Sequence, residues 1–401
     1  MNLFLRILIL ALVLFSPVRA EKSAPPQTLQ PGVSATEIKI GNISCYTGSA
    51  KEYATVARAE AAYFQMINDR GGINGRKINF ISLDSGCDTQ KSVQLARHLV
   101  EQDGVLLLFS TFGTEANLAI RSYLNEKQVP QLFLESSSAV FDDPAHFPWT
   151  MGFFPTYRTE GRAYAKYILQ KKPDAKLALL FANDDVGREY VAGLRDALGN
   201  NASLIVKEAT YDGPEANLDS QLRDLKQSSA AVLLNFCVGA MATQAIRKAA
   251  ELDWHPLQFI PNASLSVAAF LEPAGLAQSS GLISNARSKG WHTPQSQRDP
   301  AVRDFLEWMN KYNPDANLRD QNYVAGYERA EALLVVLRNC GNDLTRANVM
   351  KQASHLDVEL PMLRPGIRVH TTPTDYQPIK QLFLIQFDGK EWMPIGPVSS
   401  E

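Results

Sequence analysis

The sequence predicts an α/β protein of two Rossmann-like lobes, each built on a parallel central sheet, joined by a three-segment hinge. Apolar runs typical of buried strands alternate with amphipathic runs typical of helices along most of the 401 residues. This alternation favours parallel sheets covered by helices on both faces. The alternation breaks at the aromatic segment 147–155 and then starts again. Since single cores rarely grow beyond roughly 250–300 residues, two domains are expected.

The segment 68–77, NDRGGINGRK, connects the first helix of this pattern to a strand. Gly71 or Gly72 can adopt the left-handed conformation that closes a helix C-terminus. Asn74-Gly75 is a tight-turn pair. The apolar run 78–83 that follows is typical of a buried strand. Four apolar residues upstream fall on one helical face, namely Val56, Ala59, Tyr63 and Ile67.

The other elements follow in order from the same periodicity. In the first unit we expect strands at 38–43, 78–83, 105–109 and 131–134, with helices at 53–68, 90–102 and 115–126. In the second unit we expect helices at 159–170, 188–198, 218–226 and 241–252, with strands at 177–181, 203–207, 231–236 and 259–260.

Helices at 299–312, 322–339 and 345–353 and a final strand at 380–387 complete the pattern. The late helices are expected to return to the first lobe and the last strands to the second. The predicted lobes are 37–154 plus 286–364, and 155–285 plus 365–397.

The N-terminal segment 1–20 is typical of a secretory signal peptide. Arg6 lies in an apolar run that is followed by Pro17 and by small residues up to Ala20. The run is shorter than the roughly twenty residues of a membrane span, which disfavours a membrane anchor. The Pro-containing segment 21–36 is expected to be a flexible leader.

Charge disfavours nucleic acid as a partner. Without Arg6 and Arg19, 38 Lys and Arg remain against 42 Asp and Glu, so the mature chain is weakly acidic. A nucleic-acid-binding surface would require a basic stripe, and the sequence contains none.

Four cysteines in an exported chain allow up to two disulfides. Cys45 follows the first predicted strand and Cys87 follows the second. If these strands are parallel neighbours, both cysteines lie at one sheet edge and could form a disulfide. Cys237 and Cys340 are expected to be free thiols.

Three predicted strand ends in the first lobe carry small, polar or aromatic residues, and ligands of open α/β sheets bind beyond the carboxyl ends of strands. Hydroxyl groups and free N–H groups at a helix N-terminus suit a carboxylate, although single hydroxyls there could merely cap helices. Phe154 and other aromatic residues could form apolar walls, or could only fill the core. The candidate ligand-binding residues are Tyr46, Tyr53, Phe112, Gly113, Thr114, Ser136, Ser137, Ser138, Tyr157, Asp185, Phe236 and Asn262.

The sequence resembles substrate-binding proteins of the leucine/isoleucine/valine-binding family, which have the type I periplasmic-binding-protein fold. The resemblance runs from about residue 37 to residue 397. It rests on the order and spacing of several short motifs: IKIG at 38–41, TG at 47–48, AE at 59–60, GGING at 71–75, Asp84 with CD at 87–88, NDDVG at 183–187 and AIRKA at 245–249.

The resemblance implies a periplasmic receptor for an ABC importer, whose permease and ATPase subunits are separate chains. It also implies that Gly113 or Thr114 and the serines at 136–138 hold a ligand carboxylate. Amino-acid-binding relatives add ammonium acceptors at positions that are Val186, Val238 and Ala263 here. An aromatic or similarly apolar carboxylic acid is therefore the favoured ligand.

Two alternatives remain open. The chain could bind branched-chain or other amino acids, with Glu135, Asp184 or Asp185 as the ammonium acceptor. It could also be a ligand-sensing domain that docks to a separate signalling receptor.

Catalysis is not expected. The sequence has no Gly-x-Gly-x-x-Gly after a strand, no phosphate-binding Walker loop and no Gly-x-Ser-x-Gly elbow. Its six histidines are scattered and show no metal-ligand spacing. We expect no cofactor and no metal.

Overall fold

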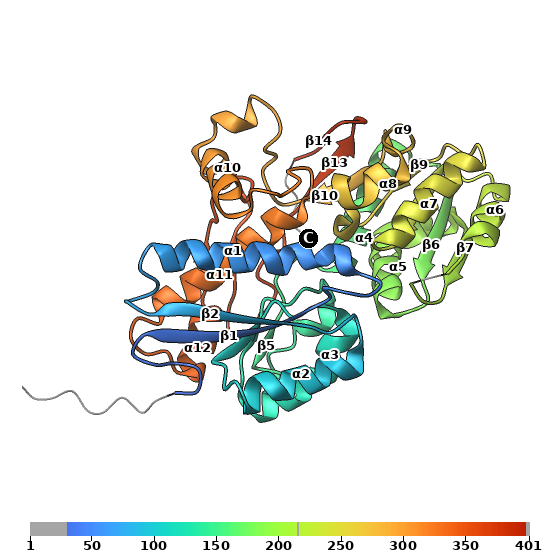
Figure 1. The fold of residues 1–401 in the computed structure, drawn as a ribbon. Coiled ribbons are helices and arrows are strands. Elements are labelled where there is room, and N and C mark those ends of the chain that lie inside the picture. Colours follow the sequence, from blue (N-terminus) through green and yellow to red (C-terminus); the bar gives the residue numbers. More distant parts are fainter. Residues whose placement is uncertain (1–29, 215, 398–401) are drawn as a thin grey trace, which may run out of the picture.

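Two α/β lobes lie side by side in the computed structural model, which describes residues 30–214 and 216–397 (Figure 1). Each lobe has a sheet with parallel central strands and helices on both faces, so the predicted fold class is confirmed. The predicted signal peptide, residues 1–20, lies outside the described residues, as does most of the predicted leader.

The first lobe contains a parallel sheet with the strand order β2-β1-β3-β4-β5. One face packs against α1 and α11, and the other packs against α2 and α3. The elements of this lobe up to the first crossing are β1 (Glu37–Ser44), α1 (Ala54–Asp69), β2 (Lys77–Asp84), α2 (Thr89–Glu101), β3 (Leu107–Phe109), α3 (Thr114–Glu126), β4 (Gln131–Leu132) and β5 (Thr150–Met151).

The return between α1 and β2 forms as the sequence predicts. The Gly72 N–H donates to the Ile67 carbonyl at 2.9 Å, which closes the helix. Gly72 has φ +79°, and a Cβ there would lie 2.0 Å from the Arg76 carbonyl oxygen, so only glycine fits. Asn74 and Gly75 both have positive φ in the turn that follows.

The second lobe repeats the strand order of the first, as β7-β6-β8-β9-β10, and adds β13 and β14 as antiparallel strands at one edge. Helices α4 and α5 pack on one face, and α6 and α7 pack on the other. Its elements before the second crossing are α4 (Tyr157–Lys171), β6 (Leu177–Ala182), α5 (Asp185–Leu198), β7 (Ile205–Tyr211), α6 (Asp219–Gln227), β8 (Val232–Phe236), α7 (Ala240–Glu251), β9 (Leu257–Phe259), the short helices α8 (Glu272–Ala274) and α9 (Leu276–Ser279), and β10 (Ile283–Ala286).

The late helices return to the first lobe, where α10 and α11 join its core. None of the helices in the described chain is long and apolar enough to cross a membrane. The remaining elements are α10 (Pro300–Tyr312), α11 (Asn322–Asn339), α12 (Arg346–Ala353), β11 (Asp357–Val358), β12 (Val369–His370), β13 (Phe383–Phe387) and β14 (Trp392–Pro394).

The third crossing lies later in the chain than the predicted boundary at residue 365. The Thr371 hydroxyl donates to the Ala353 carbonyl at 2.7 Å, and the Tyr376 N–H donates to Asp142 at 2.6 Å. These partners belong to the first lobe, so the chain joins the second sheet only at β13. The predicted boundary lay between residues 364 and 365, at a Pro-Gly pair that is typical of a turn.

The end of the predicted leader is part of the fold, which corrects the boundary at residue 36. The Lys39 N–H donates to the Gly32 carbonyl at 2.7 Å, and Arg76 Nε donates to the Ser34 carbonyl at 2.9 Å. These main-chain acceptors hold residues 30–36 against β1.

Cys45 and Cys87 form a disulfide between the carboxyl ends of β1 and β2, with Cα atoms 5.0 Å apart. The two strands are parallel neighbours in register from Glu37 with Lys77 to Ser44 with Asp84, which brings the cysteines together. Cys237 and Cys340 are buried free thiols.

Candidate functional site

A cavity of about 1060 Å³ lies between the lobes, at the carboxyl ends of their strands. It has the volume of a site for a drug-sized ligand, and both lobes contribute to its walls. Most of the candidate ligand-binding residues line it, namely Tyr53, Phe112, Gly113, Thr114, Ser136, Ser137, Tyr157, Phe236 and Asn262. That these side chains contact a ligand stays a prediction.

One end of the cavity is rich in hydrogen-bonding groups. We call it the hydroxyl end and define it by Thr114, Ser136, Ser137 and Tyr157. Helix α3 begins beside Gly113, which has φ +91°, and no side chain of the described residues caps it. The first bond within the helix runs from the Asn117 N–H to the Gly113 carbonyl, so the preceding N–H groups have no partner in the helix. These groups and the helix dipole favour a negative charge.

The hydroxyl groups at this end contact one another. Thr114 Oγ1 and Ser136 Oγ are 2.7 Å apart. The Ser137 hydroxyl has no hydrogen-bond partner among the described residues. The main-chain carbonyl of Ser137 accepts from the Tyr157 N–H at 2.8 Å. Burial raises the pKa of Tyr157 to about 12, although hydrogen bonds from Ser137, Thr114 and Ser136 oppose the rise. Tyr157 is therefore a neutral donor at neutral pH.

Three candidate residues do not line the cavity. Tyr46 hydrogen-bonds to Ser82 at 2.7 Å within the first lobe. Ser138 donates to Glu189 of the second lobe and caps the turn that follows. Asp185 is exposed and pairs with Arg188 at 2.8 Å.

The adjacent residue Asp184 lines the cavity in place of Asp185. Asp184 caps α5 by accepting from the Gly187 N–H at 2.8 Å. The first turn of the helix then directs Asp185 toward solvent. The motif at 183–187 therefore reaches the cavity through Asp184 and not through the predicted Asp185.

Phe236 lines the cavity only marginally, because its side chain is part of the second core. It is 1% exposed and stacks on Tyr190 with ring centroids 5.0 Å apart and planes 8° apart. Phe112 and Tyr53 line the cavity as a neighbouring pair, with their ring centroids 5.7 Å apart.

Arg287 lines the cavity and was not identified from the sequence. It follows β10 at the second crossing, and its guanidinium lies 3.8 Å from the ring centroid of Phe154. Nε is 3.2 Å from Glu328, and Nη1 donates to Asn262 at 3.2 Å. Nη2 has no hydrogen-bond partner among the described residues. An arginine directly after a buried strand was the available signal.

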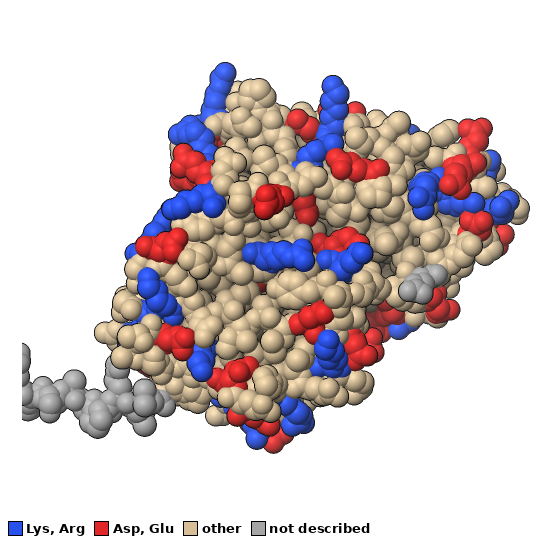
Figure 2. All heavy atoms as spheres, viewed as in Figure 1, with Lys and Arg blue, Asp and Glu red and all other residues tan. Residues whose placement is uncertain are grey.

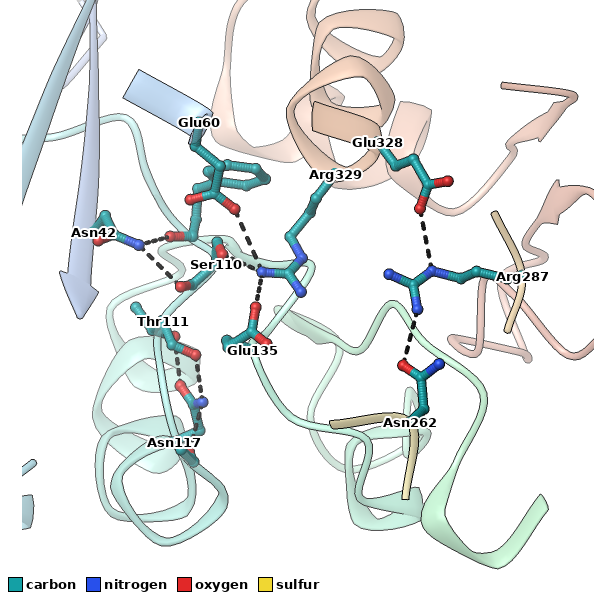
Figure 3. A network of polar contacts seen from close by, with 12 residues as sticks. Asn42, Glu60, Ser110, Thr111, Asn117, Glu135, Asn262, Arg287, Glu328 and Arg329 are labelled. Carbon is teal, nitrogen blue, oxygen red and sulfur yellow. Dashed lines mark hydrogen bonds and ion pairs between the residues drawn. The ribbon is translucent and has the colours of Figure 1, made fainter. Parts of the chain in front are cut away.

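A second buried arginine lies behind the cavity wall. Figure 3 shows Arg329 between Glu60 and Glu135, and Arg287 between Glu328 and Asn262. Arg329 is fully buried, with Nη1 3.4 Å from Glu60 and also bonded to Glu135. Among the residues labelled in Figure 3, Glu135, Arg287 and Asn262 line the cavity. The bond from Arg329 fixes the direction of the Glu135 carboxylate.

Burial changes the charge of this region. It raises the pKa of Glu60 to about 8, although Arg329 opposes the rise. It raises the pKa of Glu160 to about 7, although the Asn262 N–H and the Asn285 amide donate to that carboxylate. Protonation of these groups reduces the excess of buried carboxylates over the two arginines.

Hydrogen bonds connect the two lobes. The Tyr53 hydroxyl of the first lobe donates to the Ala263 carbonyl of the second at 3.0 Å. Glu189 accepts from Ser138 and from the Ala139 N–H. The structure therefore represents a closed arrangement of the lobes.

Within residues 30–214 and 216–397, no group of three His, Cys, Asp or Glu side chains is placed to hold a metal ion. On the face shown in Figure 2, Lys and Arg are interspersed with Asp and Glu, and no large patch of one sign is seen.

Comparisons with known proteins agree with this architecture. Leu/Ile/Val-binding protein homolog 7 of Brucella suis is 24% identical over 344 residues, which are 81% of this chain and 83% of that protein. A branched chain amino acid ABC transporter structure from Thermus thermophilus with bound valine has a TM-score of 0.80 at 16% identity and covers 91% of this chain and 97% of its own. A solute binding protein from R. palustris in complex with benzoate has a TM-score of 0.75 at 16% identity and covers 91% and 98%.

The family is shown by a family model described as "Periplasmic binding protein", which matches residues 37–391. That range contains every helix and strand of the two lobes except β14, so the resemblance seen in the sequence is confirmed. The chain belongs to the periplasmic binding proteins, and among them to the leucine/isoleucine/valine-binding type.

Proposed function

We propose that this protein is the periplasmic substrate-binding component of an ABC importer and that it captures an apolar or aromatic carboxylic acid between its lobes. The permease and ATPase subunits would be separate chains that recognise the closed form. The observation that supports this most directly is the hydroxyl end, where an uncapped helix N-terminus and four side-chain hydroxyls lie together beside aromatic rings.

A carboxylate fits this end chemically. It would accept from the main-chain N–H groups at the start of α3 and from Thr114, Ser137 and Tyr157. Hydrogen bonds to an ionised acceptor contribute about 1.5–3 kcal/mol each. A micromolar site corresponds to about −8 kcal/mol, so a few such bonds and one buried ring would suffice.

The second lobe supports an acid without an ammonium group. Val186, Val238 and Ala263 line the cavity where amino-acid-binding relatives would have acceptors. An ammonium group facing these side chains would lose its hydration without replacement, which is costly. A ring facing Tyr53, Phe112 or Phe154 would gain roughly 0.5–1.5 kcal/mol beyond the burial of its area.

Amino-acid binding is the second candidate, and Glu135 is the observation in its favour. This carboxylate lines the cavity, and its Oε1 has no hydrogen-bond partner among the described residues. Its other oxygen is bonded to Arg329, which weakens it as an ammonium acceptor. The similar structure from Thermus thermophilus holds valine, which is a reason to include amino acids in the binding test.

Calorimetric titration of the purified protein with benzoate, phenylacetate, valine and leucine tests the proposal. We expect the aromatic acids to bind and the amino acids to bind at least tenfold more weakly. Tight binding of valine or leucine without binding of either aromatic acid would refute the aromatic-acid assignment and favour Glu135 as the ammonium acceptor.

A further inference from the structure

The cavity extends well beyond the hydroxyl end, into a region we call the hinge compartment. We define it by Trp291, Val302, Ala325, Phe383, Ile385 and Trp392, which line the same cavity; Ala325 and Trp392 are partly exposed, and the other four are at most 4% exposed. We propose that the ligand is an elongated carboxylic acid whose apolar remainder occupies the hinge compartment. This inference rests on the proposed function, because it places the carboxylate at the hydroxyl end.

The volume of the cavity supports a long ligand. An apolar cavity of about 150 Å³ holds a benzene ring. The cavity here has about 1060 Å³. A single-ring acid at the hydroxyl end would leave most of this volume unused, even though the lobes are in contact through Tyr53 and Ala263.

Two walls of the hinge compartment carry a polar atom that is already hydrogen-bonded. The Trp291 indole N–H donates to the Leu318 carbonyl at 3.0 Å, and the Trp392 indole N–H donates to the Leu265 carbonyl at 3.0 Å. With both N–H groups occupied, each indole offers mainly its apolar ring surface. Water against such walls would find few partners, whereas a hydrocarbon chain needs none. Arg364 also lines the cavity, with its guanidinium 4.1 Å from the Phe383 ring centroid and its Nη1 without a hydrogen-bond partner among the described residues.

Different elements of both lobes build the compartment. Val302 lies on α10 and Ala325 on α11, which belong to the first lobe. Phe383 and Ile385 lie on β13 of the second sheet. An apolar tail there would contact both lobes and would stabilise the closed form over the open one.

Phe154 and Arg287 also line the cavity, and they lie at two of the crossings. The guanidinium covers the ring at 3.8 Å and is itself bonded to Asn262 and paired with Glu328. These contacts hold both side chains in place on the cavity wall. A tail would leave the hydroxyl end past them.

The outer rim of the compartment is polar. Arg319 donates to Glu272 at 2.6 Å and to the Lys390 carbonyl at 2.9 Å, and Lys289 pairs with Asp299 at 2.7 Å. An apolar tail is expected to end before this rim, which limits its length.

Titration with phenylalkanoates of increasing chain length tests the inference. We would compare benzoate, 4-phenylbutyrate and 8-phenyloctanoate by calorimetry on the full mature chain. Each buried methylene contributes roughly 0.8 kcal/mol, about a fourfold gain in affinity. We therefore expect the longest acid to bind at least tenfold more tightly than benzoate.

Ala325→Phe places a ring into the compartment and should reduce the affinity for 8-phenyloctanoate at least tenfold. Ala61→Phe, on an exposed position of α1, is the matched control. A cooperative thermal unfolding transition, measured by circular dichroism, shows that the variant is folded. If Ala325→Phe does not fold, Trp392→Ala removes a wall instead and should reduce the preference for the long acid.

The outcomes separate the two proposals. If benzoate binds and the longer acids bind no better, or if Ala325→Phe leaves the long acid unaffected, the hinge compartment does not hold the tail and this inference is wrong. If none of the acids binds, the proposed function itself is wrong.

Discussion

At the scale of single residues, the polar end of the cavity depends on hydroxyl groups that lie at the start of a helix rather than on a charged side chain. Thr114 is the first residue of α3 and contacts Ser136 at 2.7 Å. Neutral donors of this kind avoid the cost of burying a permanent positive charge when no ligand is present. They still offer a carboxylate several N–H and O–H groups.

Thr114→Val should lower the affinity for the best-binding acid about tenfold. The change keeps the shape of the side chain but removes one hydroxyl, and a hydrogen bond to a charged group contributes about 1.5 kcal/mol or more. Thr89→Val is the matched control, since Thr89 is the first residue of α2 and lies outside the cavity. Calorimetry measures both variants. Equal affinities for Thr114→Val and Thr89→Val would show that the hydroxyl does not contact the ligand.

Glu160→Gln should flatten the dependence of stability on pH. Burial raises the pKa of Glu160 to about 7 in the folded protein, above its ordinary value near 4.5. The folded state therefore holds a proton that the unfolded state releases, and this contribution to stability is present below about pH 4.5 and lost as the pH rises to about 7. Its full size is on the order of 3 kcal/mol.

Denaturant unfolding at pH 5, 6, 7 and 8 measures this effect. The wild type should lose stability as the pH rises, and Glu160→Gln should lose less. Glu126→Gln, on the exposed end of α3, is the control and should follow the wild type. A variant at position 160 with the same pH slope as the wild type would contradict the prediction.

Some residues of the site could not be predicted from the sequence because contacts between distant segments decide their positions. Ser138 does not line the cavity, because its hydroxyl donates a hydrogen bond to Glu189 of the other lobe. Arg287 enters the wall because Glu328 and Asn262 hold it there. Glycine and strand-end patterns, by contrast, are local, and they correctly placed Gly113 and Ser136 at the cavity.

At the scale of elements, the alternation of strands and helices was predictable from the sequence. The spacing of apolar residues that marks a helix or a strand depends only on neighbouring residues in the chain. The return at 68–77 and the strands β1 and β2 agree with the sequence closely. β7 begins at Ile205 rather than at residue 203, since a 3₁₀ turn, Gly199–Leu204, precedes it. The antiparallel pairing of β13 with β10 depends on where the chain crosses between lobes, which the sequence pattern does not encode.

Removing the disulfide between β1 and β2 should destabilise the protein. Cys45 and Cys87 are separated by 42 residues, and closing a loop of that length restricts the unfolded chain by about 4 kcal/mol in the chain-entropy model. Cys45→Ser/Cys87→Ser should lower the free energy of unfolding by an amount up to this value. The wild type should lose stability when a reductant is added, whereas the double variant should not respond. A reductant effect of equal size in both would assign the loss to other groups.

At the scale of the whole molecule, several hydrogen bonds connect the lobes, including those from Arg319 to Glu272 and from Ser266 to Asp320. Two others are made by hydroxyl groups that a conservative substitution can remove. Tyr53 donates to the Ala263 carbonyl at 3.0 Å, and Ser138 donates to Glu189. Each contributes on the order of 1 kcal/mol to the closed form. The balance between open and closed forms sets the apparent affinity, because a ligand that needs the closed form binds in proportion to its population.

The double variant Tyr53→Phe/Ser138→Ala should therefore shift the protein toward the open form. A loss of about 2 kcal/mol from the closed form would reduce acid affinity up to about thirtyfold. Small-angle X-ray scattering should show a larger radius of gyration for the unliganded variant, and saturating acid should restore the compact form. Tyr123→Phe is the matched control, because the Tyr123 hydroxyl donates to Glu101 within the first lobe at 2.8 Å.

The two measurements must agree for this interpretation of the lobe contacts to stand. Ser138 lies outside the cavity wall, so an effect of Ser138→Ala alone on affinity would act through closure and not through direct contact. Its contribution should add to that of Tyr53→Phe, since the two bonds share no residue. Unchanged scattering together with reduced affinity would instead mean that Tyr53 contacts the ligand directly, as its position on the cavity wall allows.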